Sequence, residues 1–218
     1  MAVDNDQFIG FRYQDAGYVT MMSEDWANGV FTWPGCRGFQ TTPMDHYMKP
    51  FQYQYEHYSP KIMDNMLHKD SCREYHYDIM DYLKNFLKAY PDKPKFSISW
   101  ISTLSHDYEN TLSSSDDYFY HFLKDNQKDF DNSFTFFMGD HGLRFGQVRE
   151  THVGEIEDDN PFLFVSVPQH LRKNSTIMQQ LKANSKELIT HYDIYATLNE
   201  IAQVCLQLSF AFIIYTLF

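Results

Sequence analysis

Ser133-Phe-Thr-Phe-Phe-Met-Gly-Asp140-His141-Gly142 is an apolar run that stops abruptly and is followed by two metal-ligand side chains. Its uncharged start, with three Phe and a Met, is typical of a β-strand buried on both faces. In an open α/β sheet, ligands bind beyond the carboxyl ends of the strands, which is where Asp140 and His141 stand. Their oxygen and nitrogen suit Zn²⁺ or Mn²⁺ better than Ca²⁺ or Mg²⁺. An ordinary polar turn is the alternative, since Asp and Gly are common in turns.

The composition indicates a folded domain and excludes some partners. The chain has 218 residues, of which 43% are hydrophobic and 17% aromatic, enough for one domain or part of a larger one. A net charge of −11 leaves no basic face for phosphates, so no nucleic-acid partner is expected. Cys36, Cys72 and Cys205 are too few for a disulfide scaffold. A Cys36–Cys72 bridge and two separate thiols stay open as alternatives.

The two ends of the chain bear on localisation. Met1-Ala-Val-Asp-Asn-Asp6 has no apolar core of a signal peptide, so either the protein is cytosolic or its true beginning is missing. The sequon Asn174-Ser-Thr176 favours the secretory route weakly. Residues 201–218 carry no charge but are short for a membrane helix. We therefore separate a domain, 1–203, from an apolar tail, 204–218, which is a membrane anchor, a buried terminal helix or a mis-joined coding segment.

The order of apolar patterns predicts the fold class. Strands alternate with amphipathic helices, which is typical of an α/β fold with a mostly parallel sheet flanked by helices. The expected strands are 17–22, Lys95–Ile101, the run from Ser133, and 161–168. The expected helices are Cys72–Tyr90, one capped by Ser113 to Ser115, and His191–Gln203 capped by Thr190. Trp26 to Pro60 is expected to be irregular, and Leu143 to Asn160 to be a polar loop.

Polar side chains follow the other expected strands as well. Glu24-Asp25 comes after the first, and Ser102-Thr-Leu-Ser-His106-Asp107 after the second. Arg144 and Arg149 lie in the loop after Asp140-His141 and could hold an anionic substrate through paired N–H groups. An exposed loop arginine without a ligand is the alternative for each.

Met138-Gly-Asp140-His141-Gly142 also begins a series of motifs that resembles a known family. The series resembles a family of largely uncharacterised extracellular proteins (a domain of unknown function), itself similar to the sulfatase and alkaline-phosphatase superfamily. The likeness covers roughly residues 10–203. The further motifs are Ala16-Gly-Tyr-Val-Thr20, Glu24-Asp25, Gly38-Phe39 with Pro43, Ser102–Asp107, Leu143-Arg-Phe-Gly146, Arg149-Glu-Thr151, Gly154-Glu155, Asn160-Pro-Phe162 and His191–Leu198.

The resemblance implies a role for several residues. In the superfamily the Asp-His pair after a core strand binds a divalent metal, so Asp140 and His141 inherit that role. His106 stands where a His serves the metal or the anionic oxygens of the substrate. Glu24-Asp25 replaces an expected Lys, a departure that leaves that part of the site unassigned. The implied reaction is hydrolysis of a phosphate or sulfate ester by a metal-activated Ser, Thr or modified Cys.

The same resemblance implies that this chain is the C-terminal part of a longer, secreted protein. In the superfamily, an Asp ligand and the nucleophile precede the Gly-Tyr-Val-Thr segment. The 16 residues before Gly17 contain neither motif. The fold is therefore expected to be incomplete at its N-terminus, and this chain to be inactive and to bind metal poorly by itself. A non-catalytic secreted binding protein on the same fold is the alternative.

Overall fold

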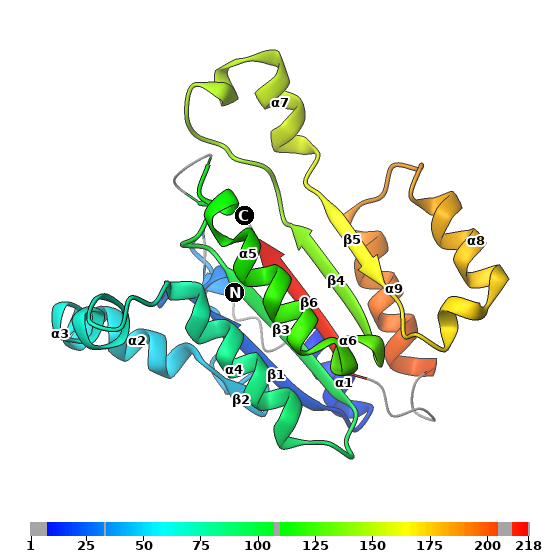
Figure 1. Cartoon of the computed structure of the whole chain (residues 1–218), viewed down its shortest axis with the longest axis horizontal. Coiled ribbons are helices and arrows are strands. Elements are labelled where there is room, and N and C mark those ends of the chain that lie inside the picture. The colour runs from blue at the N-terminus through cyan, green and yellow to red at the C-terminus, as the bar shows by residue number, and fades with distance from the viewer. Residues whose placement is uncertain (1–7, 33, 107–109, 205–210, 218) are drawn as a thin grey trace.

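The computed structural model describes residues 8–32, 34–106, 110–204 and 211–217 (Figure 1). Within this part of the chain, six strands form one sheet in the order β2-β1-β3-β6-β4-β5. They are β1 (Val19–Glu24), β2 (His46–Tyr47), β3 (Lys95–Ile101), β4 (Ser133–Gly139), β5 (Leu163–Ser166) and β6 (Ala211–Leu217). Neighbouring strands are parallel, except that β5 runs antiparallel to β4. The predicted α/β class with a mostly parallel sheet is confirmed.

Helices cover both faces of the sheet (Figure 1). On one face, α1 (Ile9–Asp15) and α9 (His191–Val204) enclose a core with Phe96 and Phe136. Tyr13 of α1 is fully buried there, where it stacks on Phe96 at 3.9 Å between ring centroids and donates its hydroxyl to the Leu198 carbonyl at 2.9 Å. On the other face, α4 (Tyr75–Ala89), α5 (Leu112–Asp125) and α6 (Gln127–Asp131) enclose the second core.

The remaining helical elements lie outside these two layers or connect them. They are α2 (Lys49–Tyr58), α3 (Pro60–Asp64), a π-helical segment at Asn65–Lys69, α7 (His152–Asp159), α8 (Ser175–Asn184), and 3₁₀ turns at Val30–Thr32, Val148–Glu150 and Leu171–Lys173. Helix α7 stands beyond the carboxyl end of β4 (Figure 1).

Strong apolar periodicity gave correct predictions. Strand β3 has the predicted bounds, β4 ends at Gly139, and α4 lies within the predicted range 72–90. Ile79, Met80 and Leu83 recur at the spacing of a helix face and are fully buried. Burial of this stripe against β1 and β3 explains why α4 forms where it does.

Two local predictions were wrong because the helices concerned bury little apolar surface, and a third placed a helix cap too late in the sequence. The segment Trp26–Pro60 is not wholly irregular, since it contains α2, in which only Gln52 and Tyr55 are buried. The expected polar loop Leu143–Asn160 contains α7, which buries only Gly154 and Asp158. A helix that buries so few apolar side chains leaves no 3.6-residue pattern to detect. Residues 113–115 do not cap α5, because they lie inside it after Thr111.

The apolar tail contributes a strand. Residues 211–217 form β6 between β3 and β4, and Ala211 pairs with both Lys95 and Ser133. The expectation of a buried terminal helix was therefore wrong, as the β-branched and aromatic run Ile213-Ile-Tyr-Thr216 suits a strand better. Among the described residues, no helix has the length and apolar character needed to cross a membrane. Cys205 and Asp107 lie outside the described residues.

The structure bears on the alternative left open for Cys36 and Cys72. Both are exposed free thiols, so the bridge between them is not formed.

Candidate functional site

Asp140 and His141 lie together at the end of β4. The His141 backbone N–H donates to Asp140 Oδ1 at 2.9 Å, and His141 Nε2 lies 3.5 Å from Asp140 Oδ2. Strand β4 positions them because it is anchored on both faces, with Phe136 in one core and Phe137 packed against the other. The carboxylate and the imidazole therefore face a common point beyond the strand.

The hydrogen bonds of His141 fix which ring nitrogen carries the proton. Nδ1 lies 2.6 Å from the Gly142 carbonyl oxygen, which can only accept, so Nδ1 carries the hydrogen and donates it. Nε2 then has a lone pair, which accepts from Arg144 Nη2 at 2.6 Å. A neutral imidazole oriented by a backbone carbonyl through its other nitrogen is the form in which His binds metals.

Arg144 occupies the position that a cation would take beside this pair. Its guanidinium is bonded to the Nε2 lone pair of His141, which in turn lies beside the Asp140 carboxylate. Burial raises the pKa of Asp140, while the backbone N–H of His141 and the charge of Arg144 counteract that rise. The site thus holds a partly buried carboxyl group next to a positive side chain.

A cavity of about 490 Å³ opens beside His141. This volume is within the usual range for small-molecule sites, roughly 300–1,000 Å³. Ser105 and Asn110, from the segment after β3, form one part of its wall. The segment after β4 and α7 forms the rest, through residues that include His141, Gly142, Phe145, Arg149, Glu157 and Phe162.

Two glycines allow α7 to approach this cavity. The Gly142 N–H donates to the Asp158 carbonyl at 2.8 Å, and a Cβ at Gly142 would lie 2.1 Å from the Glu157 carbonyl oxygen. A Cβ at Gly154 would lie 2.0 Å from the Val148 carbonyl oxygen. Both distances are shorter than any tolerated contact, so only glycine fits at either position. The close approach at Gly142 is made to the backbone of α7.

A second polar cluster lies at the carboxyl end of β1. Asp25 Oδ1 accepts from the Ser102 N–H at 2.7 Å, and Oδ2 accepts from the Thr103 N–H at 3.0 Å and from its hydroxyl. Glu24 is buried, and its Oε2 accepts from the Val30 N–H at 3.0 Å. Because β3 and β6 separate β1 from β4, Asp25 and Asp140 stand about 14 Å apart along the sheet edge. The two clusters are separate.

A family model for proteins of unknown function, DUF229, matches residues 1–209. The chain belongs to the DUF229 family. The match confirms the predicted membership of a family of unknown function, and it takes in Asp140, His141 and the cavity beside them. No curated protein and no solved structure matches the chain.

The DUF229 chain brings only some of the predicted site residues together. His141 and Arg149 line the cavity, and Asp140 and Arg144 contact His141. His106 packs its ring against Phe145, with 5.5 Å between centroids, at the edge of the same region. Arg149 donates from Nε to Asp158 Oδ2 at 2.9 Å, so part of its guanidinium holds α7 in place.

The number of converging ligands is small in the described part of the DUF229 chain. Those residues contain no group of three or more His, Cys, Asp or Glu side chains that could hold a metal ion. Structural and catalytic zinc sites use three or four protein ligands. The donor types of Asp140 and His141 fit a divalent metal, but two donors are fewer than such sites use.

Two polar residues of the cavity wall were not predicted. Asn110 and Glu157 both line it. Asn110 gave no signal, because a lone polar residue in a loop has no pattern. Glu157 reaches the cavity because it lies on α7, a helix that was not predicted from the sequence. The start of α7 could have been recognised from the sequence. Thr151 is its N-cap, with Oγ1 accepting from the Gly154 N–H at 3.1 Å, and Pro161 follows its end.

Proposed function

We propose that this chain carries part of the site of a secreted, metal-dependent hydrolase of phosphate or sulfate esters. The observation that carries the proposal is that Asp140 and His141 lie together beside a cavity of about 490 Å³. The Gly142 carbonyl orients the His141 ring so that its Nε2 keeps a lone pair for a ligand. The motif resemblance to the sulfatase and alkaline-phosphatase superfamily supplies the reaction class and the extracellular location.

In this proposal Asp140 and His141 hold Zn²⁺ or Mn²⁺, with Ca²⁺ or Mg²⁺ as weaker candidates. A bound divalent ion would stabilise the negative charge that develops on the oxygens of the ester. Arg149 lines the cavity and would hold the anionic group by paired N–H donation. His106 stands at the edge of the cavity, where it would donate to a substrate oxygen. The remaining ligand and the nucleophile would come from outside the described residues.

We expect Asp140→Ala to weaken metal binding at least tenfold, because the variant loses one of the two converging donors. Isothermal titration of the whole chain with ZnCl₂ and with MnCl₂, carried to concentrations that saturate a weak site, measures this. Asp159→Ala, at an exposed carboxylate of α7, is the matched control and should bind as the parent chain does. Equal affinity in the parent chain and Asp140→Ala would remove the basis of the site.

Arg144→Ala should have the opposite effect. Its guanidinium bonds to the His141 nitrogen that a metal would use, at 2.6 Å. Removing it frees that nitrogen and removes a positive charge, so the affinity for Zn²⁺ should rise several-fold. Arg144→Lys, which keeps the charge but loses the planar fork, should lie between the two. Unchanged or weaker binding by Arg144→Ala would show that Arg144 does not compete for the site.

A non-catalytic binding protein on the same fold is the second candidate. It is favoured by the small number of converging ligands and by the cation that Arg144 already supplies. Titration with 4-nitrophenyl phosphate and 4-nitrophenyl sulfate separates the two. Saturable binding of either ester without zinc dependence supports the binding protein, and binding that requires zinc supports the hydrolase.

A further inference from the structure

A second concave site lies between α5 and the edge strand β5, and is called the α5–β5 groove here. Its floor is the outer face of β4 and β5, from Thr135, Phe137, Phe164 and Ser166, and its wall is α5 with Phe119 and Leu123. The groove has a volume of about 680 Å³. It borders the cavity beside His141 but contains neither of the proposed metal ligands.

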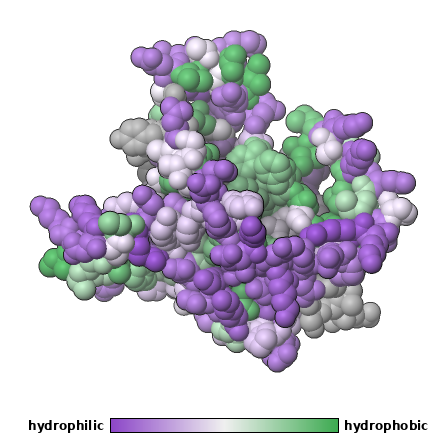
Figure 2. All heavy atoms as spheres, viewed as in Figure 1, coloured by the Kyte–Doolittle hydropathy of each residue, from purple (hydrophilic) through white to green (hydrophobic). Residues whose placement is uncertain are grey.

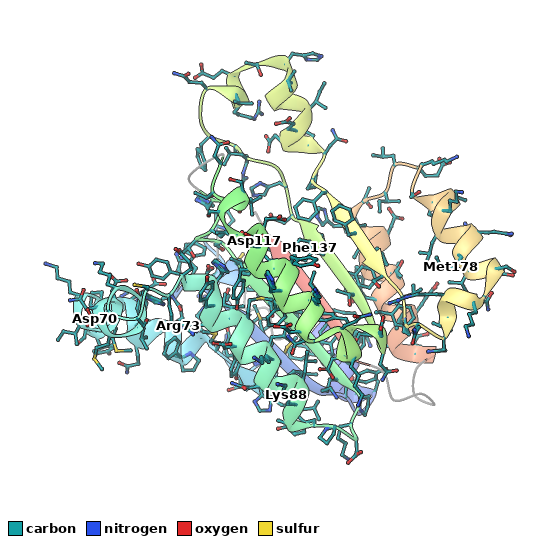
Figure 3. The ribbon with its side chains drawn as sticks, viewed as in Figure 1. Asp70, Arg73, Lys88, Asp117, Phe137 and Met178 are labelled. Carbon is teal, nitrogen blue, oxygen red and sulfur yellow. The ribbon has the colours of Figure 1, made fainter. Side chains whose placement is uncertain are left out.

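Strand register explains why the floor is continuous. Thr135 pairs with Ser166 and Phe137 pairs with Phe164, so all four side chains leave the same face of the two strands. Phe119 of α5 covers Phe137 at 5.9 Å between ring centroids. Phe137 is labelled in Figure 3, beside α5 on the near face of the sheet.

The groove is left uncovered by the rest of the described chain. Phe164 is 67% exposed and Leu123 is 38% exposed, although both are large apolar side chains. Figure 2 shows hydrophobic surface at the centre of this face, next to a broad hydrophilic region. Exposed apolar side chains that line one concave site, rather than lying scattered, are a feature of ligand-binding grooves.

The Thr135 hydroxyl is the feature that points to a ligand. Thr135 is 7% exposed, and its Oγ1 is buried with no hydrogen-bond partner among the described residues. A buried hydroxyl without a partner is unfavourable, because it has lost its water and gained nothing in return. A ligand that places one polar group at the floor would satisfy it while its apolar body contacts Phe119, Phe137 and Phe164.

We propose that the α5–β5 groove binds a small neutral aromatic molecule that carries a hydroxyl or carbonyl group. The volume suits a small molecule, since such sites span about 300–1,000 Å³. A protein partner would need a much larger surface, on the order of 1,000 Å² in total. Asp116 is the charged side chain that lines the groove in the described part of the chain, and it disfavours an anion. The ligand therefore differs in class from an anionic ester.

The test compares 2-naphthol with 2-methylnaphthalene, which have similar shape but differ in the hydroxyl group. Binding of each probe to the full chain is followed by the probe's own fluorescence. Thr135→Val removes the orphan hydroxyl and keeps the side-chain shape. It should weaken 2-naphthol binding about fivefold, the effect of one neutral hydrogen bond, and leave 2-methylnaphthalene binding unchanged. Phe164→Ala should weaken both probes by similar factors.

Two controls keep the outcome clear. Thr135→Val should unfold at the same temperature as the parent chain or a higher one, because it removes an unsatisfied buried group. Thr197→Val, on α9 behind the sheet, should bind both probes like the parent chain. The proposal is overturned if neither probe saturates, or if Thr135→Val weakens both equally. It is also overturned if sedimentation shows a dimer that Phe164→Ala dissociates and that excludes both probes, because a second copy would then be the occupant.

Discussion

Asp25→Ala should lower the free energy of unfolding by about 3 kcal/mol, one of the two largest effects expected for a single substitution. The Asp25 carboxyl group accepts three hydrogen bonds from Ser102 and Thr103, residues 77 and 78 positions away in the chain. The side chain is buried, and so is Ser102. Alanine would leave the buried Ser102 N–H without an acceptor and would leave a void beside the turn.

Urea unfolding followed by circular dichroism measures the loss. Asp25→Asn keeps the size and one acceptor oxygen, so it should lose about half as much. Asp15→Ala, at an exposed carboxylate, should change stability by less than about 0.5 kcal/mol. The Asp25 bonds also hold the turn that leads to Ser105 and His106. If Asp25→Ala were as stable as Asp15→Ala, the carboxyl group would not anchor that turn.

The parts of the fold that could be predicted are those with strong apolar patterns. Strands β3 and β4 and helix α4 each bury apolar side chains at a fixed period, which the sequence displays directly. Helices α2 and α7 could not be found in this way, because contacts made elsewhere in the chain stabilise them. The Glu56 side chain of α2 accepts from the Ala27 N–H at 2.7 Å, and α7 is held by Gly142 and by Arg149. Such contacts leave no local signal.

The candidate site also has features that the sequence predicts and features that only the coordinates reveal. The position of Asp140-His141 follows from the abrupt end of an apolar strand, so it could be predicted. The proton on His141 Nδ1 could not, because it depends on the 2.6 Å contact with the Gly142 carbonyl. The partners of the two arginines also needed coordinates. Arg149 bonds to Asp158 and Arg144 to His141, so each has a protein partner in addition to the predicted role with an anion.

Glu24→Gln should change how stability depends on pH. Burial raises the pKa of Glu24 from 4.5 to about 7, although its bond from Val30 and the charge of Lys49 oppose the rise. The folded protein therefore binds this proton more tightly than the unfolded chain between about pH 4.5 and 7. The resulting stabilisation is fully present below pH 4.5 and is lost as the pH rises to 7. The loss is about 1.4 kcal/mol per pH unit, or about 3 kcal/mol in total.

The pH profile of the parent chain will not display the Glu24 slope by itself, because the titration of His76 changes stability with pH in the opposite direction. Burial lowers the pKa of His76 from 6.5 to about 4, so its neutral form is favoured in the folded state and stability rises with pH over that range. The difference in unfolding free energy between Glu24→Gln and the parent chain removes the His76 contribution. It should favour the variant by about 3 kcal/mol more at pH 8 than at pH 4. Glu187→Gln, at an exposed position, should give a flat difference. A flat difference for Glu24→Gln as well would mean that Glu24 is solvated in the folded protein, and that the carboxyl end of β1 is open to water.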